Sequence, residues 1–453
     1  MTETKNIIVV GGNAAGPSAA AKAKRLSPNS NVLLFEAGDF ISTGTCELPY
    51  LLAGEINSYK DIVFYDPESF EKEKGVRVYT RHFVENINRR QKTISVKNLN
   101  DNSKFEIPFD KLILTTGSIV NKIKDLDDSL KNVFYLKSVK NYLSIKEYIS
   151  ANLYKNVLII GGGYIGLETS EAFKNLGCNV TVLEKSKLPL LGAGVEIQNL
   201  ILETLNKNNI EFIGNVDSPK YIIENGEVKA VNINSRIKEF DIIIIAAGVK
   251  PNNTLALSSR LDIGKFGGIK VDNKLRTSDP NIFAAGDNIE IVNRITRKND
   301  YLPLSTFAHK HGHIAGANAA GANEFCQPII KNIAVKIFDN VYVGVGLNET
   351  QAKESGFNFY KVSASANNLV RVMPGSRKIF SQLLFDKENG FIIGAEFFGG
   401  KEGIGFGDLI SSMIYNKNKA ETLAEIDFNY TPPLSPFINV LSILGRKIKR
   451  GTL

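Results

Sequence analysis

Cys46 is the residue of this chain whose type and surroundings best suit redox chemistry. It lies in the stretch "DFISTGTCELPYLL", residues 39 to 52, just ahead of an apolar segment. A cysteine reacts as its thiolate, which is a strong nucleophile. If "LPYLLAGE" begins a helix, Cys46 sits at the positive end of that helix, where the dipole stabilises a thiolate by about 0.3 to 1 kcal/mol.

Few other groups compete with Cys46 for a chemical role. The chain has three cysteines far apart in sequence, so neither a disulfide framework nor a Cys-x-x-Cys metal site is available. We interpret Cys178 as a packed thiol, and Cys326 as a bystander whose neighbour Glu324 raises its pKa. Three of the four histidines lie in "AHKHGH", but no cysteine or clustered carboxylate is near to complete a metal site.

The composition is that of a globular protein with several domains. The chain has 453 residues, of which 43% are hydrophobic and 23% charged. The net charge is +8, but the lysines are scattered, which favours a polyanionic small substrate over nucleic acid or a membrane surface. No signal peptide and no apolar run of about 18 residues is present, so we expect a cytoplasmic protein.

Two stretches with strand, glycine-rich turn and helix must position this chemistry. In the first, "NIIVVGGNAAG" (6 to 16) leads into the helix-prone "PSAAAKAKRL" and then the strand "NVLLFEAG". Such a βαβ unit receives a pyrophosphate at the helix amino terminus, and an acid ending the second strand binds a ribose. Glu36 has the place of that acid. Gly11 and Gly16 fit the fingerprint, whereas Asn13 occupies its middle glycine position.

The second unit, "NVLIIGGGYIGLETSEAFKNLGCNVTVLEKS", is a complete fingerprint. It has the glycines Gly161, Gly163 and Gly166. Two such units predict two dinucleotides, and a flavin with a nicotinamide is the economical pair. Glu184 ends the second strand and favours NADH because it binds the ribose hydroxyls and repels a 2′-phosphate; Lys185 and Lys187 soften that preference.

Four further stretches carry a family resemblance. We interpret each as a buried strand ending in small residues: "FDKLILTTGS" (109 to 118), "DIIIIAAGVKPN" (241 to 252), "TSDPNIFAAGDN" (277 to 288) and "LPLSTFAHKHGHIAG" (302 to 316). In this order, around two glycine fingerprints, they resemble the pyridine nucleotide-disulfide oxidoreductases over nearly the whole chain. The resemblance implies an α/β fold with two Rossmann-like dinucleotide-binding domains and a carboxy-terminal α+β interface domain.

The resemblance also implies domain boundaries and cofactor sites. A discontinuous FAD-binding domain covers 1 to 118 and 249 to 328, the NAD(P)H-binding domain 119 to 248, and the interface domain 329 to 453. The cofactors are FAD and NADH, with NADPH as the alternative. The implied cofactor-binding residues are Gly11, Gly12, Asn13, Ala14, Ala15, Gly16, Glu36, Thr116, Gly117, Gly161, Gly163, Tyr164, Ile165, Gly166, Glu184, Gly248, Gly286 and Asp287.

Cys46 then resembles the redox cysteine of the family's single-cysteine branch. Disulfide reductases of the lipoamide and glutathione type carry two cysteines five apart, but position 41 here is Ile41. Ser42-x-x-x-Cys46 followed by "ELPY" is similar to coenzyme A-disulfide reductases, NADH oxidases and peroxidases, and persulfide or polysulfide reductases. In these the lone thiolate forms a mixed disulfide or cycles to a sulfenic acid.

Within that branch a disulfide, persulfide or polysulfide is the favoured acceptor. Ala14 stands where the peroxidases place a histidine. Coenzyme A-disulfide reductases have positions that serve a bulky phosphorylated thiol, and the residues here that match them are Arg25, Ser42, His309 and Tyr430. We therefore expect Cys46, Ser42 and Tyr430 to be catalytic, and Arg25 and His309 to bind substrate. Two of them have plainer readings, Arg25 as an exposed helix charge and Tyr430 as an interface aromatic.

Several departures leave the choice of disulfide open. Val372 and Met373 precede Pro374 where coenzyme A-disulfide reductases carry a tyrosine, and Tyr79 and Ile438 replace two expected lysines. A smaller disulfide, a persulfide or a polysulfide suits the same mechanism. The alternatives are an NADH oxidase and a non-enzymatic FAD- and NADH-binding redox sensor, which has no need of the cysteine.

The carboxy-terminal stretch "YTPPLSPFINVLSILGRKI" predicts how chains assemble. Its apolar residues at helical spacing form either a core stripe or a dimer contact. They are Phe437, Val440, Leu441 and Leu444. In the family this region crosses a two-fold dimer, so the resemblance implies a homodimer with composite active sites, in which Tyr430 reaches the partner's cysteine.

Overall fold

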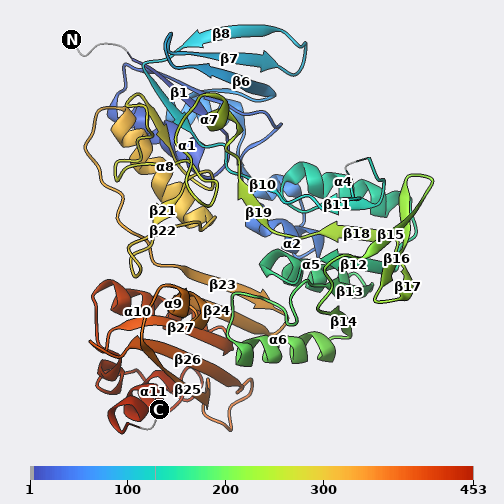
Figure 1. Ribbon diagram of the computed structural model, residues 1–453, viewed down its shortest axis with the longest axis vertical. Helices are drawn as coiled ribbons and strands as arrows, with labels where there is room; N and C mark the ends of the chain where they lie inside the picture. Colours follow the sequence, from blue (N-terminus) through green and yellow to red (C-terminus); the bar gives the residue numbers. More distant parts are fainter. Residues whose placement is uncertain (1–4, 128, 452–453) are drawn as a thin grey trace.

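Three five-stranded sheets organise the chain, which the computed structural model describes over residues 5–127 and 129–451. Figure 1 shows the carboxy-terminal sheet, coloured orange to red, below the two sheets formed by the rest of the chain. Helices accompany every one of these sheets. The predicted α/β class is confirmed, whereas the exact domain boundaries remain a prediction.

The first sheet is parallel throughout and has the order β20-β9-β1-β2-β5. Its strands are β1 (Asn6–Val10), β2 (Asn31–Phe35), β5 (Arg77–Tyr79), β9 (Lys111–Leu114) and β20 (Ile282–Ala284). Most are continuous buried apolar runs, as in sheets covered on both faces. Helix α1 (Ala15–Leu26) follows β1, and α8 (Ser305–Ala319) packs on α1. A Cβ on Gly316 would lie 2.1 Å from the Ala19 carbonyl oxygen, so only glycine permits this close approach.

Smaller elements surround this sheet and carry the cysteine segment. Cys46 lies in η1 (Thr45–Glu47), between helix α2 and strand β3, which pairs antiparallel with β4. The other elements are β3 (Ile41–Thr43), α2 (Leu48–Leu52), η2 (Tyr59–Ile62), β4 (Val63–Tyr65), α3 (Pro67–Lys74), β6 (His82–Asn88), β7 (Thr93–Asn98), β8 (Lys104–Pro108), β10 (Ser118–Val120), β19 (Val249–Pro251), α7 (Thr254–Ser258), β21 (Ile291–Val292) and β22 (Asn299–Asp300).

The second sheet is also parallel and has the order β11-β18-β12-β13-β14. Strand β18, which lies between β11 and β12, consists of four buried isoleucines. The elements of this part are β11 (Val133–Tyr135), α4 (Val139–Ala151), β12 (Asn156–Ile160), α5 (Tyr164–Asn175), β13 (Asn179–Leu183), α6 (Val195–Lys207), β14 (Ile210–Ile213), β15 (Lys220–Glu224), β16 (Glu227–Ile233), β17 (Arg236–Glu239) and β18 (Ile242–Ile245).

The third sheet is antiparallel and has the order β23-β24-β27-β26-β25. Helices α10 and α11 bury apolar residues against it. The elements are β23 (Asn332–Ile337), β24 (Asn340–Gly346), α9 (Glu349–Glu354), β25 (Phe359–Asn367), β26 (Lys378–Asp386), β27 (Ile392–Gly399), α10 (Gly403–Tyr415), η3 (Ala420–Ala424) and α11 (Val440–Lys449).

Two expectations from the sequence are corrected. The stretch "LPLSTFAHKHGHIAG" was expected to be a strand, but from Ser305 it forms α8, whose small residues allow close packing on α1. The carboxy-terminal apolar stripe is divided: Val440, Leu441 and Leu444 are buried core residues, while Phe437 precedes α11 and is 76% exposed. The stripe is therefore neither wholly core nor wholly surface.

Candidate active site

Cys46 is exposed and lies at the amino-terminal end of a long helix. Its Sγ is 3.3 Å from Oγ of Ser305, the first residue of the 15-residue helix α8. The helix predicted at "LPYLLAGE" is present as α2, but it begins at Leu48 and has only five residues. Helix α8 therefore offers the sulfur a second and longer helix dipole.

The segment ahead of Cys46 is anchored on the first glycine turn. Ser42 has a left-handed backbone (φ +50°), and its N–H donates to the Gly12 carbonyl at 2.8 Å. The Thr43 hydroxyl donates to Oδ1 of Asn13 at 3.3 Å. A left-handed serine costs conformational energy, which this anchoring offsets. The predicted residues Ser42 and Cys46 thus belong to one segment fixed on the turn predicted to bind FAD.

The first glycine turn has the geometry of a pyrophosphate site. The carboxylate of Glu36 accepts the Gly12 N–H at 2.6 Å, which fixes the acid beside the turn. Gly11 has φ +109°, and a Cβ on Gly16 would lie 1.8 Å from the Gly11 oxygen. No side chain caps α1; the Gly16 N–H donates to the Asn13 carbonyl at 3.0 Å and Pro17 has no N–H, which leaves the N–H of Ala15 to meet an anion at this helix end. At the start of this helix lie Asn13, Ala14 and Ala15.

A cluster of hydrogen-bonded polar residues lies where β9 and β20 end. Oδ2 of Asp287 accepts the Ser118 hydroxyl at 3.0 Å, and burial raises the pKa of Asp287. Asn288 is fully buried; its amide donates to Oγ1 of Thr116 at 3.2 Å, while its Oδ1 has no partner among the described residues. A buried oxygen without a partner indicates a missing polar ligand, so these residues fit FAD. Glycines with positive φ nearby are Gly117, Gly248 and Gly286.

The second glycine turn repeats the first. Oε2 of Glu184 accepts the Gly162 N–H at 2.6 Å, and α5 has no side-chain cap at Gly163, where an added Cβ would meet open space. Lys185 is paired with Asp217 at 2.7 Å. That ion pair reduces the positive charge beside Glu184, the acid predicted to bind the ribose. The first residues of α5, and the glycine that packs it on β12, are Tyr164, Ile165 and Gly166.

Helix α8 carries a row of polar residues that begins at Ser305, beside Cys46. His309 is exposed one turn beyond Ser305, and His313 follows one turn later, so all three share one helix face. The guanidinium of Arg25 lies 3.0 Å from Nε2 of His313. The two predicted substrate-binding residues, Arg25 and His309, thus lie near the same row of side chains. The direct contact of Arg25 is with His313, one turn beyond His309.

Tyr430 is not brought to Cys46 within one chain. It is 49% exposed, and its ring packs edge-to-face on Phe437 with centroids 5.3 Å apart. Over residues 5–127 and 129–451, no hydrogen bond or ring contact joins it to Cys46 or Ser42. Leu434 is 71% exposed beside it in sequence, so this segment presents an apolar surface.

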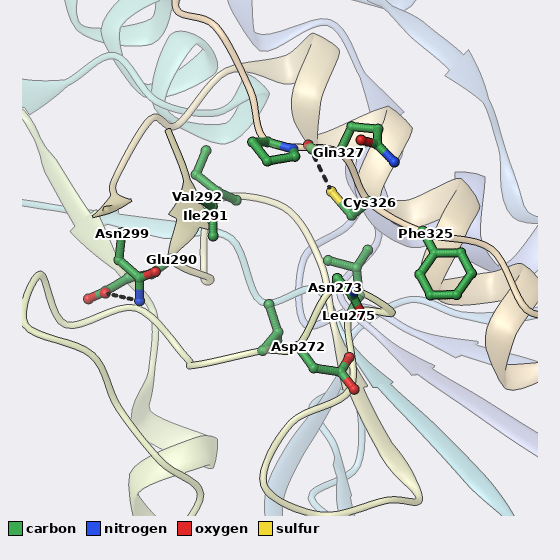
Figure 2. A pocket seen from close by; sticks show the side chains of 12 residues that line it. Asp272, Asn273, Leu275, Glu290, Ile291, Val292, Asn299, Phe325, Cys326 and Gln327 are labelled. Atoms are coloured by element: carbon green, nitrogen blue, oxygen red, sulfur yellow. Dashed lines mark hydrogen bonds between the residues drawn. The ribbon is translucent and has the colours of Figure 1, made fainter. Parts of the chain in front are cut away.

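The remaining cysteines lie away from these turns. Cys178 is buried, and burial raises its pKa. Cys326 lines a separate cavity of about 290 Å³ beside Phe325 and Glu290, and its thiol points to the Gln327 carbonyl at 3.7 Å (Figure 2). Burial, rather than the predicted Glu324, raises the pKa of Cys326. Within the described part of the chain, no group of histidine, cysteine and acidic residues could hold a metal ion.

Sequence reasoning missed a tyrosine–glutamate pair near the cysteine. The Tyr50 hydroxyl, on α2, donates to Oε1 of Glu168, on α5, at 3.0 Å. One turn along α5, Glu171 is paired with Lys336 of β23 and accepts the N–H of Phe338 at 2.6 Å. Helix α5 therefore joins the cysteine segment to the carboxy-terminal sheet.

Replacing Glu168 with glutamine is expected to stabilise the protein above neutral pH. Burial raises the pKa of Glu168 from 4.5 to about 7, so the folded state binds the proton more tightly and stability falls as pH rises through that window. Neutral glutamine avoids a loss of at most about 3 kcal/mol. Thermal melts at acid and mildly alkaline pH test this, with exposed Glu203→Gln as the control. Equal stabilisation at both pH values would contradict the assignment.

Family comparisons agree with this geometry. The family model of the pyridine nucleotide-disulphide oxidoreductases matches residues 5–312, and that of their dimerisation domain matches residues 333–440. In the described part of the chain, no helix has the length and apolar character needed to cross a bilayer.

Similar proteins cover nearly the whole chain. It is 30% identical over 440 residues to an NADH oxidase of Methanocaldococcus jannaschii, which spans 96% of this chain and 97% of the relative. It is 30% identical over 452 residues to a coenzyme A disulfide reductase of Staphylococcus aureus (98% and 99%). The structure of a NAD-dependent persulfide reductase from A. fulgidus superposes with a TM-score of 0.94 at 29% identity, covering 99% of this chain and 84% of that one. The chain belongs to the pyridine nucleotide-disulphide oxidoreductase family.

Proposed function

We propose that this enzyme uses NAD(P)H to reduce a low-molecular-weight disulfide, persulfide or polysulfide through FAD and Cys46. The observation that carries the proposal is the exposed Cys46 thiol, fixed beside the first glycine turn and the end of α8. The similar coenzyme A disulfide reductase and persulfide reductase bear names of this chemistry. A thiol that must stay free also suits the reducing cytoplasm.

The chain supplies binding and orientation for two cofactors. Glu36 and the open end of α1 would hold the ribose and pyrophosphate of FAD, with Asp287 and Asn288 at the strand ends. Glu184 and the open end of α5 would hold NADH. Bound FAD supplies two-electron transfer from the nicotinamide to sulfur.

Cys46 performs the exchange with substrate. Its thiolate attacks one sulfur of R–S–S–R, forms a Cys46–S–S–R mixed disulfide and releases one thiolate, R–S⁻. Two electrons from NADH then cleave the mixed disulfide, which returns the Cys46 thiolate and releases the second R–S⁻. Electrons balance because one NADH is oxidised for each disulfide reduced.

The row along α8 favours an acidic substrate. His309 and His313 extend from Ser305 along α8, Arg25 of the neighbouring α1 contacts His313, and the chain has a net charge of +8. A phosphorylated thiol such as coenzyme A places its anionic end away from its sulfur, as this row requires. Arg25 and His309 therefore remain our proposed substrate-binding residues.

A panel of acceptors tests the function. Purified flavoprotein with NADH is offered coenzyme A disulfide, cystine, glutathione disulfide, polysulfide and oxygen, and NADH consumption is measured. We expect turnover with at least one sulfur acceptor well above that with oxygen. The relative named NADH oxidase makes oxygen the necessary comparison. Turnover with oxygen alone would contradict the proposal.

NADH is expected to be preferred over NADPH. Glu184→Gln keeps the size of the side chain but loses its charge, so kcat/KM for NADH should fall about tenfold or more and the NADH-to-NADPH ratio should narrow. Initial rates with both nucleotides measure this, with Glu203→Gln on α6 as the matched control. A native enzyme that prefers NADPH tenfold would show the ribose assignment to be wrong.

A homodimer would complete the site. The matched dimerisation domain supports pairing of chains. The exposed Tyr430, Leu434 and Phe437 form an apolar surface in the same part of the chain. We propose that the two-fold pairing carries Tyr430 to the partner's Cys46, which gives two composite sites per dimer.

A further inference from the structure

We infer that Ser305 is a positioning residue that holds the Cys46 sulfur and donates a hydrogen bond to it whenever it is a thiolate. The inference rests on the proposed role of Cys46. It adds a residue from the far end of the amino-terminal family match, 259 positions away in sequence, to the reacting sulfur.

Ser305 has the geometry of a dedicated partner. Its Oγ lies 3.3 Å from Sγ of Cys46, within hydrogen-bond distance for sulfur. The hydroxyl has no other hydrogen-bond partner among the described residues, and it does not cap its own helix. It is therefore free to direct its proton to the sulfur.

The helix that carries Ser305 is rigidly placed. Gly312 and Gly316 of α8 approach α1 so closely that a Cβ at either would lie within 2.2 Å of a carbonyl oxygen of α1. Helix α1 follows the first glycine turn, and Ser42 is hydrogen-bonded to that same turn. The segments that carry Cys46 and Ser305 are therefore both attached to this one turn and its helix. The contact thus does not depend on loop conformation alone.

The amino end of α8 directs partial positive charge toward the sulfur, while Glu47 follows Cys46 in η1. No acidic residue lies in the first turn of α8, and no side chain caps its amino end. The partial positive charge of this end and the Ser305 hydroxyl act in the same direction on a negative sulfur. The thiolate is formed each time the mixed disulfide is cleaved, so Ser305 would assist the sulfur as it leaves, without transferring its proton.

Alkylation of Cys46 tests the inference without turnover. Holoenzyme is treated with iodoacetamide at mildly acidic pH, where the proton competes for the sulfur, and the Cys46 peptide is quantified by mass spectrometry. We expect Ser305→Ala to slow alkylation about three- to tenfold, because a donor to the thiolate is lost. Ser305→Thr should restore the rate, and Thr306→Ala, which removes the neighbouring exposed hydroxyl, should not change it.

Two results would overturn the inference. One is an equal alkylation rate in Ser305→Ala and the native enzyme, and the other is a Ser305→Thr rate as low as that of Ser305→Ala. If either occurs while the native enzyme reduces a disulfide, only the role of Ser305 fails. If alkylation behaves as expected but no sulfur acceptor is reduced, the proposed function fails while the Ser305 contact stands.

Discussion

Cys46→Ser is expected to lose disulfide reduction by about a thousandfold or more while it keeps FAD and accepts electrons from NADH. A serine hydroxyl is a far weaker nucleophile than a thiolate and forms no mixed disulfide. The residues proposed to bind both cofactors lie elsewhere, on the two glycine turns and the strand ends. Stopped-flow reduction by NADH and steady-state disulfide turnover separate the two steps.

The control for this variant is Cys326→Ser. Cys326 lines its own cavity, so its replacement should leave both steps unchanged. Full disulfide turnover in Cys46→Ser would remove the basis of the mechanism. Loss of disulfide turnover in Cys326→Ser would instead assign the chemistry to the cavity that Cys326 lines.

Mixed dimers of Cys46→Ser and Tyr430→Phe chains are expected to regain activity that neither parent has. If Tyr430 serves the partner's Cys46, each heterodimer contains one site with both native groups and one with neither. Its activity should be about half that of the native dimer, since one of its two equivalent sites is intact. Heterodimers purified through two different tags, assayed for disulfide turnover, provide the measurement.

Tyr415 offers a matched control for the mixing experiment. It is 49% exposed, as is Tyr430, but its ring is covered by Arg294. Tyr415→Phe should be active by itself and should gain nothing from mixing. Heterodimers of Cys46→Ser with Tyr430→Phe that show only the mean of their parents would refute the composite site.

Local patterns predicted the two nucleotide-binding units because every signal in them lies within about 30 residues. The apolar runs of β1 and β12, the following glycines and the acids Glu36 and Glu184 all appear in the structure as expected. Helix α8 was mistaken for a strand because its small residues mask helical periodicity. Its burial depends on close contact with α1, which is a property of tertiary packing.

The candidate site was predictable only in part. The chemical type of Cys46 and its spacing from Ser42 can be read from one short segment, whereas the left-handed backbone of Ser42 is known only from the structure. Ser305 could not be assigned from the sequence, because it reaches Cys46 only after α8 folds onto α1. The sequence contained one indication of His313, its spacing of four residues from His309. Its contact with Arg25 could not be predicted, because it forms only when α8 packs on α1.

The most direct test of the central claim is the mass of the enzyme after it is mixed with coenzyme A disulfide in the absence of NADH. The Cys46 thiolate should exchange with the disulfide, release one thiol and retain the other half as a mixed disulfide. We predict one adduct per chain, found by peptide mapping on the Cys46 peptide and removed when NADH is added. An adduct confined to Cys178 or Cys326, or steady coenzyme A disulfide turnover with an unmodified Cys46, would contradict the account.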